Sequence, residues 1–244
     1  MKKLEIKNIS KSFDGKPVLQ NISLELKQGE LVCLLGVSGG GKTTLFNIIS
    51  GLLAPDQGSV FLDETDITNK PGQISYMLQK DLLLPYRTIE DNIALPLLLK
   101  GKKKKEARLQ VAPMFAQFGL EGTQKKYPAQ LSGGMRQRAA LLRTYMFSQE
   151  VALLDEPFSA LDTLTKSAIH KWYLAMMEQI QLSTLFITHD IDEAILLSDR
   201  IYLLSGSPGE ITGEIIIQEP KPRRDDFNLS PEFLAYKRKI LSLL

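Results

Sequence analysis

The chain has 244 residues, of which 43% are hydrophobic and 24% charged, an ordinary balance for a folded chain with its own core. Its 30 basic and 28 acidic residues leave a net charge of +2, which argues against a nucleic-acid binder, because such proteins concentrate an excess of Lys and Arg. The single cysteine excludes an internal disulfide framework, and no apolar run approaches the ~20 residues of a membrane-spanning helix.

The N-terminal part of the chain predicts strands and then a helix. Leu4–Ser10 and Val18–Leu26 alternate apolar and polar residues, with an Asp-Gly turn between them. Leu31–Leu35 is a continuous apolar run that ends at Gly36, as expected of a buried strand. Thr43–Gly51 carries apolar residues at helical spacing. The predicted order is therefore strand, glycine-rich loop and helix.

The rest of the chain predicts a helical insertion within an α/β core. Short strands are expected at Ser59–Leu62 and Ile74–Leu78, and the pattern is mostly helical from Asp81 to about Phe147. Strand signals resume at Val151–Leu154, Ser183–Thr188, Arg200–Leu204 and Glu214–Ile217. Ser230 is the expected N-cap of a last helix. We expect residues 1–80 and 150–229 to form the core with its β subdomain, 81–149 a helical subdomain and 230–244 a C-terminal helix.

The glycine-rich loop fits the pattern G-x-x-x-x-G-K-[ST] of a P-loop. Its glycines let successive N–H groups face a phosphate chain, and the start of the following helix adds partial positive charge. Lys42 is expected to reach the β- and γ-phosphates, and the Thr43 hydroxyl to bind Mg²⁺. A glycine-rich turn that binds nothing is the alternative, disfavoured by the flanking strand and helix. The expected nucleotide-binding residues of this segment are Gly36, Val37, Ser38, Gly39, Gly40, Gly41, Lys42, Thr43 and Thr44.

A second motif is the apolar strand Val151–Leu154, which is followed by Asp155 and Glu156. A buried strand presents carboxylates at its end, because inside the strand they would lose their hydration. Asp155 is placed to hold Mg²⁺, directly or through water, and Glu156 to polarise a water for attack on the γ-phosphate. The alternative is an acidic pair that only begins a loop, and the P-loop earlier in the chain argues against it.

A third motif, Leu131–Arg138, combines an expected N-cap, Ser132, with two glycines that bare the backbone N–H groups. An ordinary capped helix is the alternative. A second anion-binding helix start in a chain with one P-loop instead suggests a nucleotide held from two sides.

The order and spacing of these motifs resemble the ATP-binding cassette (ABC) ATPases over nearly the whole chain. The resemblance rests on Gly36–Thr43, Leu131–Gln137, Val151–Glu156, Ser159–Asp162 and His189. It implies an α/β fold: a P-loop NTPase core with an N-terminal antiparallel β subdomain and an inserted α-helical subdomain. It also implies ATP and Mg²⁺ as cofactors and a head-to-tail dimer, in which each ATP lies between the P-loop of one copy and the signature motif, Leu131–Gln137, of the other.

The same resemblance assigns further site residues. Outside the P-loop, the nucleotide-binding residues that it implies are Phe13, Ser132, Gly133, Gly134, Gln137 and Asp162. Gln79 would sense Mg²⁺ and the attacking water, His189 would contact the γ-phosphate, and Phe13 would stack on adenine. The alternatives are simple strand packing for Phe13, an ordinary strand-end residue for Gln79 and a packed core histidine for His189.

A narrower resemblance concerns Leu83–Ile89, Asp91–Leu97, Ser205–Ile211 and Lys221–Asp225, which are similar to importer cassettes for nitrate, sulfonate, taurine and thiamine-precursor pyrimidines. It implies a peripheral ATPase on the cytoplasmic face of the cell membrane, with permease subunits and, indirectly, an extracellular solute-binding protein as partners. A soluble ABC ATPase acting on nucleic acid or ribosomes is the alternative, disfavoured because no long coiled-coil insertion or second cassette is present.

The apolar segment Asp81–Tyr86 is the expected docking surface for the membrane subunit, with Leu83 and Tyr86 as its contact residues. The alternative is that these side chains pack the helical insertion onto the core.

Overall fold

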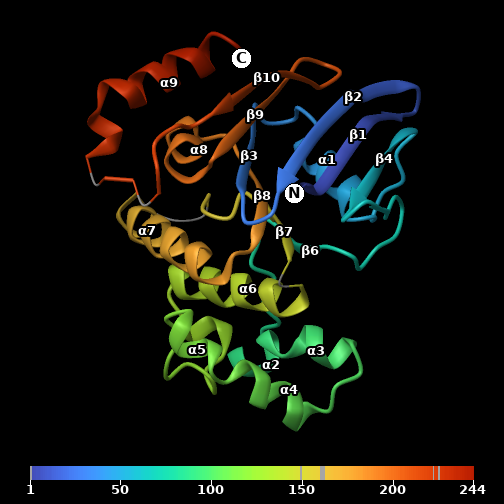
Figure 1. Ribbon diagram of the computed structural model, residues 1–244. Helices are drawn as coiled ribbons and strands as arrows, with labels where there is room; N and C mark the ends of the chain where they lie inside the picture. The colour runs from blue at the N-terminus through green and yellow to red at the C-terminus, as the bar shows by residue number, and fades with distance from the viewer. Residues whose placement is uncertain (1, 149, 160–162, 222, 225) are drawn as a thin grey trace.

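The computed structural model describes residues 2–148, 150–159, 163–221, 223–224 and 226–244. The chain forms a mixed α/β structure built around two sheets (Figure 1). The antiparallel sheet has the order β2-β1-β4-β5 and consists of β1 (Lys2–Phe13), β2 (Lys16–Lys27), β4 (Gln57–Leu62) and β5 (Thr65–Asp66).

The central sheet has the order β10-β9-β3-β8-β7-β6, and all of its pairs are parallel except β9 with β10. Its strands are β3 (Leu31–Gly36), β6 (Ser75–Met77), β7 (Val151–Asp155), β8 (Ser183–Thr188), β9 (Arg200–Ser205) and β10 (Glu210–Ile216). The parallel strands point their carboxyl ends to one edge, so residues that follow β3, β6, β7 and β8 gather there.

The apolar run of β3 has a simple cause, since the strand is buried on both faces. Leu31, Cys33 and Leu35 belong to one hydrophobic core, together with residues of the helices. Val32 and Leu34 belong to a second core, between the central sheet, the antiparallel sheet and α1 (Lys42–Ile49).

The segment between β6 and β7 is helical, as predicted, and lies at one end of the molecule (Figure 1). Its helices are α2 (Ile89–Ile93), α3 (Leu95–Leu99), α4 (Lys104–Val111), α5 (Met114–Gln117), the 3-10 turn η1 (Pro128–Gln130) and α6 (Gly133–Phe147). The remaining elements are α7 (Thr163–Ile180), α8 (Ile191–Leu197), η2 (Phe227–Leu229) and α9 (Pro231–Leu241).

The predicted strands are all present, although β10 begins at Glu210 rather than Glu214. Ser230 caps α9 as predicted, because its side chain accepts a hydrogen bond from the Phe233 N–H at 3.1 Å. The two-residue strand β5 and the helices α7 and α8 were not predicted. Within the described residues, no helix combines the length and apolar character that crossing a membrane requires.

Candidate functional site

The P-loop joins β3 to α1 and lies close to β9. A Cβ on Gly36 would come within 2.3 Å of the backbone oxygen of Leu204, so only glycine fits this approach of two strands. Gly39 and Gly41 have φ values of 81° and 88°, which side-chain-bearing residues rarely adopt. The loop conformation therefore depends on glycine at three positions of the motif.

Lys42 begins α1, and its side chain folds back beneath this loop. Its ammonium donates to the carbonyl oxygens of Gly36, at 2.9 Å, and Val37, at 2.7 Å, and the residue is only 6% exposed. Burial lowers the pKa of Lys42, while the charges of Glu156 and Asp155 oppose that shift. Among the described residues, no carboxylate forms an ion pair with this ammonium. A buried cation without a counter-ion suits an anionic ligand.

Thr43 and Asp155 connect the start of α1 to the end of β7. The Thr43 hydroxyl donates to Asp155 Oδ2 at 3.2 Å, and the Tyr76 hydroxyl lies 3.4 Å from the same oxygen. Burial raises the pKa of Asp155, and the hydrogen bond from Thr43 opposes that shift. A hydroxyl and a carboxylate side by side are hard oxygen donors of the kind that Mg²⁺ prefers, so the residues present fit that ion.

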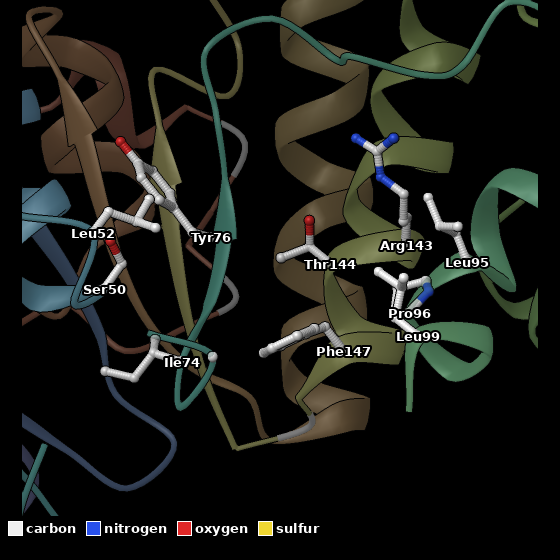
Figure 2. A pocket seen from close by; sticks show the side chains of 11 residues that line it. Ser50, Leu52, Ile74, Tyr76, Leu95, Pro96, Leu99, Arg143, Thr144 and Phe147 are labelled. Carbon is white, nitrogen blue, oxygen red and sulfur yellow. The ribbon is translucent and has the colours of Figure 1, made fainter. Parts of the chain in front are cut away.

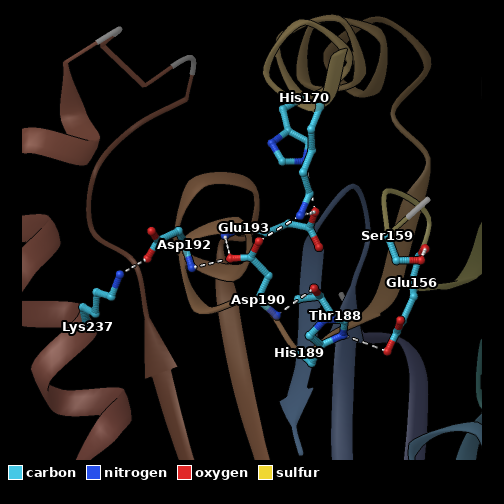
Figure 3. Close-up of polar contacts among 10 residues, drawn as sticks. Glu156, Ser159, His170, Thr188, His189, Asp190, Asp192, Glu193 and Lys237 are labelled. Carbon is cyan, nitrogen blue, oxygen red and sulfur yellow. Dashed lines mark hydrogen bonds and ion pairs between the residues drawn. The ribbon is translucent and has the colours of Figure 1, made fainter. Parts of the chain in front are cut away.

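Glu156 lies at the centre of three residues that follow adjacent parallel strands. Gln79 follows β6, Glu156 follows β7 and His189 follows β8. The Gln79 amide donates to Glu156 Oε2 at 3.0 Å. His189 Nδ1 lies 3.0 Å from Glu156 Oε1, as Figure 3 shows. Each carboxylate oxygen thus has a partner from a different strand, which fixes the orientation of the carboxyl group.

Glu156 also has an unusual backbone conformation, with φ 45°. Its N–H donates to the Ile187 carbonyl of β8 at 3.1 Å, and the Ser159 N–H and hydroxyl donate to its own carbonyl, at 3.2 and 3.0 Å. Such a conformation persists when neighbouring bonds hold it, and this one turns the chain where β7 ends.

The signature motif begins α6. Ser132 Oγ accepts a hydrogen bond from the Met135 N–H at 3.3 Å, so Ser132 is the N-cap. A Cβ on Gly134 would lie 3.3 Å from Thr165 Cγ2 and 3.4 Å from Ile169 Cδ1, both on α7. Gly134 therefore also has a packing role, because it lets α6 approach α7.

The signature motif and the P-loop share no hydrogen bond among the residues that the structure describes. Gln137 instead donates through its amide to the Pro157 carbonyl, next to Glu156. In the described part of the chain, no hydrogen bond joins Ser132, Gly133 or Gly134 to residues 36–44. Hydrogen bonds instead join Thr43 to Asp155, and Gln79 and His189 to Glu156, the residue after Asp155.

Two other predicted site residues are less well defined. Phe13 ends β1 and is partly exposed, and the Lys11 ammonium lies 5.5 Å from the centre of its ring. Because the ring is partly exposed, a ligand could stack on it, whereas a side chain that only packed the strand would be buried. Asp162 lies outside the described residues.

The segment after Gln79 is held by residues that sequence reasoning missed. Arg143 of α6 donates to the carbonyl oxygens of Leu82, at 2.8 Å, and Asp81, at 2.5 Å. The buried Asn92 side chain accepts from the Leu84 N–H at 2.6 Å and donates to the Leu84 carbonyl at 3.1 Å. These contacts join positions 8 to 62 residues apart. The sequence shows that Arg143 and Asn92 are polar, but it does not show which backbone groups they bond.

The prediction that Leu83 is a surface docking residue is wrong, and the prediction for Tyr86 agrees with its exposure. Leu83 is 6% exposed and belongs to the core that includes β3, whereas Tyr86 is 92% exposed. The run Asp81–Tyr86 is not exposed as a whole, because Asn92 of α2 holds the backbone around Leu84.

Beside this segment lies a cavity of about 310 Å³ (Figure 2). Leu52 and Tyr76 line it from the central sheet and α1 side, and Leu99 and Phe147 from α3 and α6. Most of the remaining lining is apolar, with Arg143 at its margin. The Tyr76 hydroxyl also reaches Asp155, so the same side chain touches the cavity and the acidic end of β7.

Known proteins of one family are similar to most of this chain. Residues 19–159 match the family described as ABC transporter. The chain is 47% identical over 194 residues to the formylaminopyrimidine import ATP-binding protein of Halalkalibacterium halodurans, covering 80% of this chain and 76% of that protein. It is 37% identical over 252 residues to the nitrate import ATP-binding protein of Synechocystis, covering 99% and 94%.

A solved structure is similar as well. It is a dimeric ATP-binding cassette in a post-hydrolysis state bound to ADP and phosphate. It aligns with a TM-score of 0.74 and 30% identity, covering 89% of this chain and 100% of that one.

Proposed function

The chain belongs to the ABC transporter family of ATP-binding proteins, and from this membership we propose that it is the ATP-hydrolysing subunit that powers solute import through a membrane permease. The observation that carries the proposal is the Glu156 carboxylate held between Gln79 and His189, at the strand edge that also bears the P-loop. Relatives named for import of a pyrimidine and of nitrate support the direction of transport.

The P-loop is the proposed phosphate site. Its backbone N–H groups and the start of α1 face the phosphate chain, and the Lys42 ammonium exchanges its two carbonyl partners for phosphate oxygens. Thr43 and Asp155 are the proposed ligands of Mg²⁺, which neutralises phosphate charge when bound. The aromatic ring of Phe13 is the proposed partner of adenine.

Glu156 is the proposed general base. Its carboxylate accepts a proton from the attacking water, and Gln79 and His189 keep the two oxygens in a fixed orientation. His189 is also the proposed donor to the γ-phosphate, since its side chain is 55% exposed at the strand edge. The role of Gln79 is to bind the same water and Mg²⁺.

The substitution Glu156→Gln tests this assignment. The amide keeps the shape of the side chain but cannot take up the proton, so turnover should fall by about 10²- to 10⁴-fold while ATP still binds. Steady-state hydrolysis and binding of a fluorescent ATP analogue measure the two quantities separately. Hydrolysis at the wild-type rate contradicts the role of Glu156.

A head-to-tail dimer is proposed because, among the described residues, the signature motif makes no hydrogen bond to the P-loop of its own chain. In such a dimer Ser132 and Gly134 contact the ATP of the partner copy, and Asp162 contacts the partner's P-loop. The Glu156→Gln protein retains ATP, so it should dimerise with ATP and Mg²⁺. Size-exclusion chromatography with light scattering checks this, and a strict monomer with bound ATP contradicts the dimer.

The proposed permease contact is the apolar cavity between the central sheet and α3, together with the exposed Tyr86. Leu52 and Leu99 face solvent from opposite sides of this cavity, so a short apolar helix has a surface on each side to pack against. The proposed location is accordingly the cytoplasmic face of the cell membrane, with the permease in contact with an extracellular solute-binding protein. The proposed solute is nitrate, a sulfonate, taurine or a thiamine-precursor pyrimidine.

Cell fractionation tests import against the alternative role on nucleic acid or ribosomes. A tagged chain expressed with its permease should sediment with membranes, and uptake of the solute should require it. Sedimentation with ribosomes or DNA instead would overturn the transport role and leave the ATPase assignment intact.

A further inference from the structure

Of the residues described in the segment 221–225, Arg223 bonds the end of α8 and Lys221 the turn that follows it. Arg223 Nη1 donates to the Leu196 carbonyl and Nη2 to the Ser198 carbonyl, both at 2.6 Å. These carbonyls belong to the last turn of α8 and to its C-cap. A cation at the C-terminus of a helix also opposes the negative end of the helix dipole. Arg223 therefore stabilises the C-terminal end of α8 through two hydrogen bonds and through its positive charge.

The neighbouring Lys221 secures the turn that follows. Its ammonium lies 2.8 Å from Asp199 Oδ2, and the same oxygen accepts from the Leu31 N–H of β3 at 2.9 Å. The turn between α8 and β9 is thus bonded both to the C-terminal segment and to the central sheet.

The other end of α8 is bonded by α9. The Lys237 ammonium lies 2.5 Å from Asp192 Oδ1, in the first turn of α8 (Figure 3). The N-cap of α8 is Asp190, and its carboxylate accepts hydrogen bonds from the Asp192 and Glu193 N–H groups at 3.0 and 3.1 Å. The C-terminal segment therefore holds α8 at both ends, through Arg223 and Lys237.

Helix α8 begins at Ile191, so only its N-cap, Asp190, separates it from His189. The His189 side chain is 55% exposed, and in the part of the chain that the structure describes its ring nitrogen Nδ1 lies 3.0 Å from Glu156 Oε1. An exposed side chain has few neighbours to hold it, so its position depends on the backbone that carries it. That backbone is the strand end of β8 and the start of α8.

We propose that the C-terminal segment is a positioning device for His189: Arg223 and Lys237 clamp α8 and so keep the His189 imidazole in line with Glu156 and the γ-phosphate. The proposal rests on the proposed role of His189 in hydrolysis. Arg223 and Lys237 touch no reacting atom, and they act through the helix that follows His189.

Two substitutions in the full-length chain test the clamp. Arg223→Lys keeps the charge but cannot bond two carbonyls with a planar fork, and Lys237→Met removes the ion pair with Asp192. Lys239→Met is the matched control, because Lys239 is an exposed lysine of the same helix and no ion pair is described for it. Each clamp variant should lower kcat by roughly three- to tenfold, the size of a partly buried helix-end interaction. The KM for MgATP and the affinity for ADP should stay unchanged, and the control should match the wild type.

A double-mutant cycle with His189→Ala separates positioning from simple stability. If the clamp acts through His189, then Arg223→Lys and Lys237→Met should cause no further loss of single-turnover hydrolysis in the His189→Ala protein. An equal loss in both backgrounds, or wild-type kcat in both clamp variants, overturns the clamp. The Lys237→Met protein decides the matter if Arg223→Lys does not fold.

The same cycle distinguishes the two levels of inference. A slow His189→Ala protein in which the clamp variants still reduce turnover refutes the clamp alone. A His189→Ala protein with wild-type turnover refutes the role of His189 and the clamp together. Pairing Lys237→Asp with Asp192→Lys should recover part of the kcat lost in Lys237→Asp, and no recovery also counts against the clamp.

Discussion

The Thr43 hydroxyl and the Asp155 carboxylate, 112 positions apart in sequence, meet at 3.2 Å. This contact joins the first turn of α1 to the end of β7. The residue after the phosphate-binding lysine and the carboxylate at the strand end therefore lie side by side in the single chain. The proposed Mg²⁺ ligands are consequently preorganised, and the ion has little rearrangement to drive.

Replacing Lys42 with alanine should abolish hydrolysis and weaken ATP binding by roughly 10- to 100-fold, because hydrogen bonds to a charged group contribute about 1.5–3 kcal/mol. Titration with a fluorescent ATP analogue measures the affinity. Lys27→Ala, at an exposed lysine on β2, is the control and should behave as the wild type. Hydrolysis by the Lys42→Ala protein at the wild-type rate contradicts the P-loop assignment.

A mixing experiment tests whether Ser132 acts on the ATP of the partner copy. Ser132→Arg and Lys42→Ala proteins are each inactive under the dimer proposal. Their heterodimer contains one complete site and one doubly altered site, so mixing should restore part of the turnover. A structure with ATP in which Ser132 lies at the γ-phosphate of its own chain is the outcome that excludes the arrangement.

The contrast between Tyr86 and Leu83 gives a test of the permease contact. Tyr86→Asp changes an exposed side chain, so it should leave the ATPase activity of the isolated chain intact while abolishing pull-down of the permease and uptake. Leu83→Asp instead buries a charge in the core and should destabilise the fold. Undiminished permease binding by the Tyr86→Asp protein would place the contact elsewhere.

Asn92 should be one of the largest polar contributors to stability. Its buried side chain bonds the backbone of Leu84, Arg87 and Thr88, so Asn92→Ala leaves several buried groups without partners. We expect a loss of about 2–4 kcal/mol in the free energy of unfolding, since each orphaned group costs ~1–3 kcal/mol. Urea unfolding measures it, and Asn228→Ala, at an exposed asparagine, should change it little.

The fold was predictable wherever one strand or motif carried a local signal. The run Leu31–Leu35 and the glycines after it identify β3 and its loop without reference to the rest of the chain. Helix α7 carries such a signal as well, in Ile169, Tyr173, Met176 and Ile180 at helical spacing, although it was not predicted. Strand β5 has two residues, too few for any periodicity.

The site was predictable by residue type, but its geometry was not. The motifs identify Asp155 and Glu156, whereas the contact of Tyr76 with Asp155 depends on how β6 pairs with β7. The error at Leu83 has the same origin, because an apolar residue in a loop is equally consistent with a surface contact and with the core. The packing of α2 and α6 decides between them, and it involves residues far apart in sequence.

The bonds from Arg143 to the segment after Gln79 reach carbonyl oxygens of Asp81 and Leu82 and no side chain of that segment. A backbone carbonyl is the same for every amino acid, so the side chain at position 82 can change without breaking the link to α6. Mutation can therefore change the exposed side chain at position 82 while the bonds of this segment to α6 persist. The surface of the segment is thus free to diverge during evolution without loss of its attachment to the helix.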